Sequence, residues 1–192
     1  MQKFVVGITG ASGIRLGLKF TRYLAEFESG SEVFLVLSNG AKMVADYEEK
    51  MQDILCDVRA IKNITIFDDN ALHSPISSGS FGVESTFIIP CSANSLAKVA
   101  CGISDTLITR SALVALKERK LLLLAPREMP LNAIMLQNML TLSQLGAIIA
   151  PPMFAYYAKV QNLAQMEDFI CGKWLDSANI KHNLYNRWGE KS

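Results

Sequence analysis

The chain has 192 residues and a formal net charge of +1; half of its residues are hydrophobic and 19% are charged. This length suits one domain, and we treat residues 1–192 as a single domain that ends in a helix and a tail. The near-neutral charge argues against nucleic-acid binding, and no apolar run approaches the roughly 18 residues of a membrane span, so the apolar excess predicts a homo-oligomer.

Apolar segments with the composition of buried strands alternate along the chain with longer segments of helical periodicity. The expected strands cover residues 3–8, 33–37, 64–67, 86–89, 121–125 and 147–150. The expected helices cover residues 14–27, 40–56 (continuous or with a break), 95–100, 106–118, 133–145 and 163–177. This alternation predicts a doubly wound, Rossmann- or flavodoxin-like α/β fold, in which a mostly parallel sheet carries helices on both faces.

Ligands of such a fold bind beyond the carboxyl ends of the strands, near the point where the strand order reverses. The segments that follow the strands are rich in Gly, Ser, Asn and Pro, and we expect all of them on this one rim. They are residues 10–13, 38–40, 90–95, 126–130 and 151–157.

The turn after the first strand reads Gly10-Ala11-Ser12-Gly13, and the N–H groups of such a turn can bind a phosphate. It has neither the lysine of a P-loop nor the GxGxxG spacing of a dinucleotide site. The second strand ends at Ser38, where an NAD-binding fold has an acidic residue. The turn therefore favours a mononucleotide, and a tight turn without a ligand is the alternative.

Small side chains follow another strand in Cys91-Ser92-Ala93-Asn94-Ser95. This segment suits a helix N-cap beside an anionic or flavin ligand, and it equally suits an N-cap alone. Neither histidine stands in a motif that would make the Cys91 thiol a nucleophile.

Several charged residues are candidates for chemistry. Arg127 and Glu128 lie between prolines just after a strand, where they can bind a phosphate and protonate it; a surface ion pair is the alternative. Lys117 ends a helix, where a cation complements the helix dipole. Tyr157 and Lys173 can form a second anion site or serve the structure alone.

The cysteines show no CxxC pair and no metal-finger spacing, and glycine interrupts the N-terminal apolar run too early for a signal peptide. We therefore expect buried, reduced thiols in a cytoplasmic protein that holds no metal. The histidines His73 and His182 look incidental.

In this order, the rim segments resemble the UbiX-type flavin prenyltransferases, formerly described as aromatic-acid or hydroxybenzoate carboxy-lyases. The resemblance runs from residue 5 to about residue 189 and rests on residues 7–13, 77–80, 90–92, 115–119, 126–128, 146–149 and 187–190. It implies a flavoprotein that joins the dimethylallyl group of dimethylallyl phosphate to N5 and C6 of reduced FMN without a metal. It also implies a dodecamer with sites between subunits, and a UbiD-type decarboxylase, often of ubiquinone biosynthesis, that accepts the product.

The resemblance further implies roles for residues at matching positions. For FMN these are Gly10, Ala11, Ser12, Ser38, Cys91, Ser92, Ala93, Asn94 and Arg127. For the prenyl phosphate they are Tyr157, Lys173, Lys117, Glu128 and the tail residue Trp188. For catalysis they are Glu128, Lys117, Arg127, Glu48 and Ser12.

The sequence departs from the family pattern at three places. Lys173 stands where many relatives have arginine, Asn94 where lysine or glycine is common, and residues 14–16 replace a segment that often carries tyrosine. These departures leave open a monophosphate or diphosphate donor. One alternative is an FMN-dependent decarboxylase of the peptidyl-cysteine type, which would want a rim histidine and an asparagine–methionine clamp. The other is a non-catalytic flavin-binding oligomer.

Overall fold

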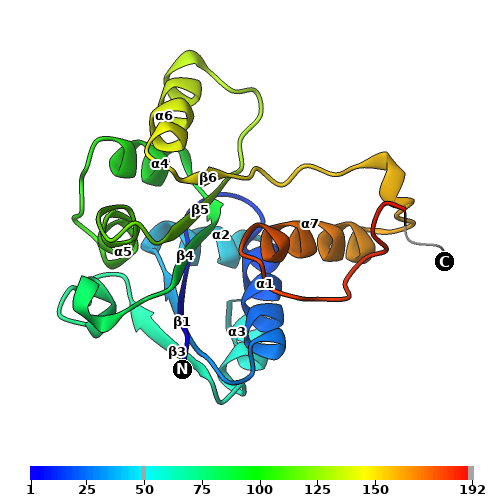
Figure 1. The fold of residues 1–192 in the computed structure, drawn as a ribbon, viewed down its shortest axis with the longest axis horizontal. Helices are drawn as coiled ribbons and strands as arrows, with labels where there is room; N and C mark the ends of the chain where they lie inside the picture. The colour runs from blue at the N-terminus through cyan, green and yellow to red at the C-terminus, as the bar shows by residue number, and fades with distance from the viewer. Residues whose placement is uncertain (49–50, 190–192) are drawn as a thin grey trace.

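The computed structural model describes residues 1–48 and 51–189, without the side chains of residues 51–54. Within them, a parallel sheet of six strands runs in the order β3-β2-β1-β4-β5-β6 (Figure 1). The strands are β1 (Lys3–Ile8), β2 (Glu32–Leu37), β3 (Ile64–Asp68), β4 (Ser85–Cys91), β5 (Leu121–Pro126) and β6 (Ile148–Ile149). The predicted fold class is confirmed.

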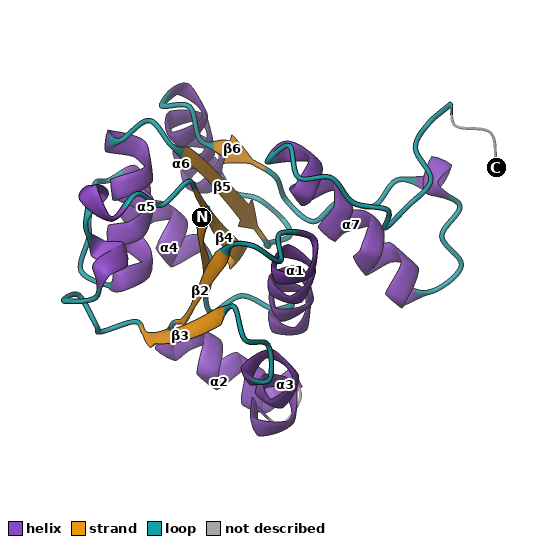
Figure 2. Cartoon of the chain, turned by 60° about the horizontal axis from the view of Figure 1, so that its bottom comes forward, coloured by secondary structure: helices purple, strands orange, loops and turns teal. Residues whose placement is uncertain are grey.

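Helices cover both faces of the sheet (Figure 2). They are α1 (Ile14–Phe27), α2 (Asn39–Glu48), α3 (Met51–Arg59), α4 (Ala93–Ala100), α5 (Leu107–Lys117), α6 (Ala133–Gln144) and α7 (Leu163–Ser177). Short 3-10 helices lie at η1 (Pro75–Ser77), η2 (Gly79–Phe81) and η3 (Tyr156–Ala158). The helical segment expected over residues 40–56, continuous or with a break, consists of two helices, α2 and α3.

The two faces of the sheet carry separate hydrophobic clusters, because successive side chains of a strand point to opposite faces. Val6 belongs to the cluster with α1, α2, α3 and α7, and its neighbour Val5 to the cluster with α4, α5 and α6. Both are fully buried. Burial on both faces explains why the strands read as near-continuous apolar runs.

The thiols only partly follow the prediction. Cys91 and Cys171 are buried, whereas Cys56 and Cys101 are exposed, so the expectation of four buried thiols is wrong.

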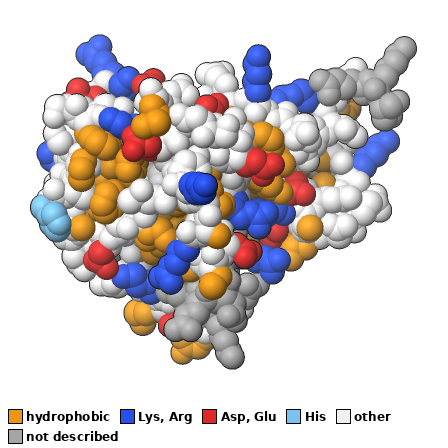
Figure 3. Space-filling view, turned by 90° about the horizontal axis from the view of Figure 1, so that it is seen from below, with side chains coloured by type: hydrophobic (Ala, Val, Ile, Leu, Met, Phe, Trp, Pro, Cys, Tyr) orange, Lys and Arg blue, Asp and Glu red, His pale blue; other side chains and the backbone are white. Residues whose placement is uncertain are grey.

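On the face shown in Figure 3, acidic and basic side chains are interspersed with hydrophobic ones. No helix among the residues described has the length and hydrophobicity to cross a bilayer.

Beyond β6 the chain leaves the sheet. Residues 150–162 form an extended arm that carries η3, and α7 then returns from the end of this arm to pack against α1 (Figure 1). The edge-to-face contact between Phe20 of α1 and Trp174 of α7, 5.9 Å between ring centroids, is part of this packing. The tail after α7 runs back toward the end of the arm.

Candidate functional site

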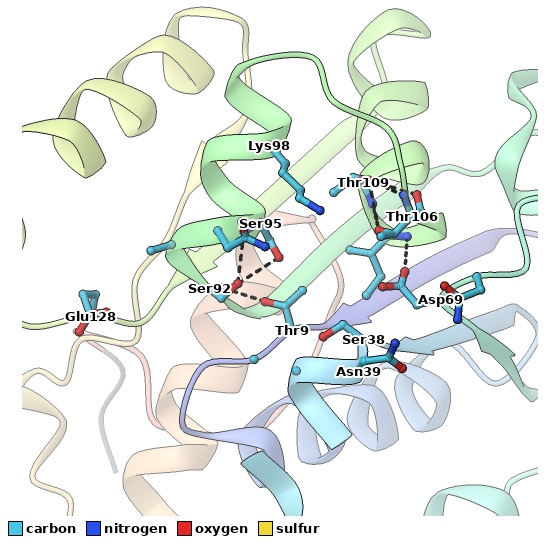
Figure 4. A pocket seen from close by; sticks show the side chains of 16 residues that line it. Thr9, Ser38, Asn39, Asp69, Ser92, Ser95, Lys98, Thr106, Thr109 and Glu128 are labelled. Atoms are coloured by element: carbon cyan, nitrogen blue, oxygen red, sulfur yellow. Dashed lines mark hydrogen bonds between the residues drawn. The ribbon is translucent and has the colours of Figure 1, made fainter. Parts of the chain in front are cut away.

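A cavity of about 470 Å³ opens at the carboxyl edge of the sheet, between the ends of β1 and β4. This is where the strand order reverses, and the volume is typical of small-ligand pockets. Polar groups from several elements converge on it (Figure 4). Six of the predicted site residues line it, namely Gly10, Ser38, Ser92, Ala93, Asn94 and Glu128.

Hydrogen bonds of Thr9 join the two strand ends that border the cavity. Its Oγ1 donates to the carbonyl of Pro90 at 2.9 Å and accepts from the N–H of Ser92 at 2.7 Å. Thr9 is buried and lines the cavity. The spacing between β1 and β4, and hence one dimension of the cavity, is therefore held by a hydroxyl that the sequence analysis missed.

Two helices present their N-termini to the cavity. Ser92 caps α4, its Oγ accepting from Ser95 N–H at 3.2 Å, and the Oγ of Ser38 accepts from Ala41 N–H of α2 at 3.0 Å. The N–H groups of Ala93 and Asn94 lie in the first turn of α4, where a helix provides them no partner. With the positive end of the helix dipole, such groups favour an anion in the cavity.

The turns that follow β1 and β2 touch backbone to backbone. A Cβ atom placed on Gly10 would lie 3.0 Å from the carbonyl carbon and Cα of Gly40. Both glycines line the cavity, so this close approach sets the shape of its floor.

Asp69, after β3, is a buried carboxylate in the cavity wall. Its Oδ1 accepts from Ile108 N–H at 2.9 Å, and its carbonyl accepts from Leu107 N–H at 2.7 Å. Burial, the largest effect, raises the pKa of Asp69 above its usual range. The Asp69 carboxylate therefore lies at the N-terminus of α5, and the sequence analysis did not identify this residue.

Two N–H groups where the glycine-rich turn meets α1 bind an acidic side chain of the same chain. The Glu48 carboxylate accepts from Gly13 N–H at 2.9 Å and 3.2 Å and from Ile14 N–H at 3.2 Å. Ala11 is buried and Ser12 is exposed, and neither lines the cavity. Glu48 thus serves here as an internal anion at the N-terminus of α1.

Cys91 is the last residue of β4 rather than part of the turn, and its side chain lies in the hydrophobic cluster with α4, α5 and α6. Burial raises the pKa of its thiol to about 12, so the group stays protonated near neutrality. The Cys91 side chain does not line the cavity, and its carbonyl accepts from Arg127 N–H at 3.2 Å.

Arg127 and Glu128 lie just beyond β5, and both are exposed. Glu128 lines the margin of the cavity, apart from the other labelled side chains in Figure 4, and its carboxylate accepts from Met129 N–H at 3.1 Å. Arg127 does not line the cavity. A further cation, Lys98 of α4, does line it and pairs with Asp105 at 2.7 Å.

Lys117 does not lie at this rim. It is the last residue of α5, whose residue Ile108 lines the cavity, so it lies about 14 Å away along the helix, at the opposite edge of the sheet. There it pairs with Glu118, whose side chain lies against Gly79. Within a single chain, Lys117 and the cavity therefore lie at opposite edges of the sheet.

Tyr157, Lys173 and Trp188 form another group, away from the cavity. The Tyr157 ring lies 5.8 Å from Phe169 and 5.4 Å from Trp188, both edge-to-face. The ammonium of Lys173, half-exposed on α7, lies 3.9 Å from Asp176. None of the three lines the cavity, and the expectation that residues 151–157 share the rim is wrong, because the arm carries them off it.

Comparisons with known proteins find a matching family and similar sequences along nearly the whole chain. The Flavoprotein family profile matches residues 1–175. A flavin prenyltransferase UbiX of Campylobacter jejuni is 48% identical over 188 residues, which cover 97% of this chain and 98% of that one.

Two solved structures have the same fold at full length. AnUbiX (PadA1), solved with FMN and dimethylallyl pyrophosphate, gives a TM-score of 0.90 at 35% identity and covers 100% of this chain and 99% of that one. A dodecameric FMN-dependent UbiX-like decarboxylase of Escherichia coli O157:H7 gives 0.90 at 35% identity, covering 98% and 100%.

Proposed function

The chain belongs to the Flavoprotein family and, within it, to the UbiX flavin prenyltransferases, and on this premise we propose that it transfers a dimethylallyl group from dimethylallyl phosphate to reduced FMN. The observation that carries the proposal is the agreement over 97% of the chain with a prenyltransferase, together with a rim cavity of suitable size. The relative solved with FMN and a dimethylallyl donor supports both substrates.

The residues around the cavity suit FMN. Hydroxyls of Thr9, Ser38 and Ser92 and the first turns of α2 and α4 supply polar groups for a ribityl chain and a phosphate. The same rim lacks an acidic residue at position 38, where a dinucleotide fold would bind a ribose. Gly10, Ser38, Ser92, Ala93 and Asn94 are therefore the cofactor residues that we keep.

The reaction breaks the allylic C–O bond of the donor, and the electron pair leaves with phosphate. Reduced FMN, when bound, would supply the electron pairs for both new bonds: N5 would bond to the allylic carbon freed from phosphate and lose its proton, and C6 would bond to the tertiary carbon of the prenyl double bond, whose other carbon takes up a proton while C6 loses one. Glu128, at the cavity margin, delivers a proton to the departing phosphate, while Arg127 and Lys117 stabilise its negative charge. Lys173 offers a point charge to the donor phosphate, where an arginine would offer a bidentate fork.

The proposed residues come together only in an assembly. Lys117 lies at the opposite edge of the sheet, and Tyr157, Lys173 and Trp188 lie with the arm and tail, so one chain cannot bring them to one phosphate. Hydrophobic side chains are exposed on α6 and the arm, as expected for subunit contacts; they are Ile134, Leu136, Leu140, Met153, Phe154 and Tyr156. The dodecameric relative supports the same assembly here.

Our proposal extends to the cellular role. The prenylated flavin would be accepted by a UbiD-type decarboxylase, and both proteins would work in the cytoplasm. Transfer of flavin from this protein to an apo-decarboxylase, followed by recovery of decarboxylation, tests the pairing. Decarboxylase activity that returns equally with unmodified FMN would contradict it.

The test of the reaction itself is direct. Anaerobic incubation with reduced FMN and dimethylallyl phosphate should convert the flavin to a product heavier by one five-carbon prenyl unit, measured by mass spectrometry. A parallel incubation with dimethylallyl diphosphate ranks the two donors. A separate incubation of the FMN-loaded protein with a peptide that ends in cysteine tests the decarboxylase alternative, which loss of CO2 from that peptide would favour. Unmodified flavin and an unchanged peptide would favour storage.

A further inference from the structure

The carboxylate of Asp176, near the end of α7, contacts three side chains of the tail that follows this helix. Its Oδ1 accepts from Nη2 of Arg187 at 2.7 Å and lies 3.1 Å from Nε2 of His182. Its Oδ2 accepts from the hydroxyl of Tyr185. The side chain of Asp176 is only 20% exposed, so these donors largely replace water around it.

The geometry of His182 shows that its bond to Asp176 is a donor bond. The N–H of Leu184 lies 3.2 Å from Nδ1 of His182, and because an amide N–H can only donate, Nδ1 must accept. In the neutral ring the proton is then on Nε2, which faces Asp176. The His182 side chain is fully buried and has a structural role. The expectation from sequence that His182 is incidental is therefore wrong.

The tail packs directly on the backbone of α7 at Gly172. A Cβ atom there would lie 2.6 Å from the ring of Tyr185 and 2.7 Å from Cε1 of His182. Burial alone would raise the pKa of Asp176, but the hydrogen bonds from Arg187 and Tyr185 outweigh it and keep the pKa below its usual range. The group is therefore ionised at neutral pH, and every partner named above is a donor that a carboxylate satisfies.

The anchored tail reaches the group of residues assigned to the prenyl phosphate. Trp188 follows Arg187 directly, and its ring meets Tyr157 of the arm at 5.4 Å between centroids. The same carboxylate lies 3.9 Å from the ammonium of Lys173. One group on α7 thus connects the position of the tail aromatic, the arm tyrosine and the lysine.

We infer that Asp176 is a positioning residue, which fixes the tail on α7 and so holds Trp188 against Tyr157 beside Lys173. The consequence for turnover rests on the proposed function: an ordered tail presents these side chains to the prenyl phosphate, whereas a released tail leaves the donor weakly bound. Asp176 itself touches neither substrate in this assignment.

The experiment compares Asp176→Asn with Asp168→Asn in the full-length protein. Asp168 is the matched control, because it lies on the same helix but binds Tyr23 and Lys19 of α1 instead of the tail. Amide hydrogen exchange of residues 181–189 should speed up about tenfold or more in Asp176→Asn and stay at the wild-type rate in Asp168→Asn.

The kinetic measurement uses the same proteins. In Asp176→Asn the KM for dimethylallyl phosphate should rise about tenfold, with FMN affinity unchanged. Asp176→Glu, which keeps the charge, should recover part of this loss. If Asp176→Asn fails to fold, Tyr185→Phe removes a single donor and should shift exchange and KM in the same direction by less.

The outcomes separate the two proposals. Wild-type exchange in the tail of Asp176→Asn would overturn the anchoring, and fast exchange with an unchanged KM would overturn the positioning role. If the wild-type protein prenylates no flavin, the proposed function fails and the positioning role fails with it, whereas the exchange rates still decide whether Asp176 anchors the tail.

Discussion

The carboxylate of Glu48 binds the N–H of Gly13 through both of its oxygens, at 2.9 Å and 3.2 Å. The contact joins the end of α2 to the start of α1, two helices that follow different strands. It supplies a negative charge at the N-terminus of α1, where the helix dipole favours one. Glu48 therefore stabilises the glycine-rich turn from within the chain.

Replacing the Glu48 carboxylate should lower the stability of the fold more than it changes the affinity for the cofactor. We expect Glu48→Ala to lower the free energy of unfolding by about 1 kcal/mol, the usual effect of losing a helix cap. Urea denaturation at fixed protein concentration measures it, with Asp46→Ala, an exposed neighbour on α2, as the control. Equal losses in both variants would show that the cap contributes nothing.

A methyl group at the cavity floor should weaken FMN binding. Gly10→Ala places a Cβ atom 3.0 Å from the backbone of Gly40, so the two turns must separate. We expect the dissociation constant for FMN to rise at least about tenfold, measured by quenching of flavin fluorescence. Gly30→Ala is the control, since its Cβ meets nothing within 4 Å. FMN affinity that is the same in both variants would place the flavin elsewhere.

Asp69 should impose a pH dependence on stability. Because its pKa is raised in the folded state, the folded protein holds this proton more tightly than the unfolded chain, and the free energy of unfolding falls as pH rises above about 4. Asp69→Asn removes the effect, so its stability relative to wild type should increase from about pH 4 to pH 7. Denaturant titrations across this range, with exposed Asp57→Asn as the control, measure it. A pH-independent difference between Asp69→Asn and wild type would contradict the prediction.

Glu128 should act on turnover rather than on flavin binding. If its carboxyl group protonates the leaving phosphate, Glu128→Gln should slow prenylation by about 10²–10⁴-fold, as for a positioned general acid, while FMN stays bound. Single-turnover absorbance of the flavin measures the rate, with Glu26→Gln, exposed on α1, as the control. Wild-type turnover in Glu128→Gln would remove it from the mechanism.

Subunits with different defects should complement each other. Lys117→Ala and Glu128→Gln should each be nearly inactive, and if the two residues at one site come from different chains, mixed oligomers should regain about a quarter of wild-type activity. The mixture is made by co-refolding and assayed against each variant refolded alone. No gain on mixing would mean that Lys117 and Glu128 of one site come from the same chain, and full activity of Lys117→Ala alone would mean that Lys117 is not needed.

Much of the sheet was predictable because parallel strands buried on both faces leave a clear apolar pattern, as at Val5 and Val6. The position of Lys117 was also within reach of the sequence. A helix that precedes a strand ends at the amino edge of the sheet, and Lys117 stands just before β5. Considering the direction of this helix would have placed Lys117 at the amino edge of the sheet, away from the rim.

Other contacts have no short-range signal. Thr9 meets Ser92 across 83 positions and Asp69 meets Ile108 across 39, so only the closed sheet brings them together. The tail is similar, because His182 looks incidental until α7 places Asp176 beside it. The arm departs from the rim because β6 is short and Pro151 and Pro152 follow it closely, which a strand count does not convey.

Two internal carboxylates decide where this rim accepts an anion. Glu48 already satisfies the start of α1, and Asp69 the start of α5, which leaves α2 and α4 as the helices whose first turns border the cavity without an acidic side chain on them. The cavity therefore offers two helix N-termini, those of α2 and α4, to a bound anion. A phosphate in this cavity is therefore expected at the first turns of α2 and α4, because Asp69 already accepts from Ile108 N–H at the start of α5.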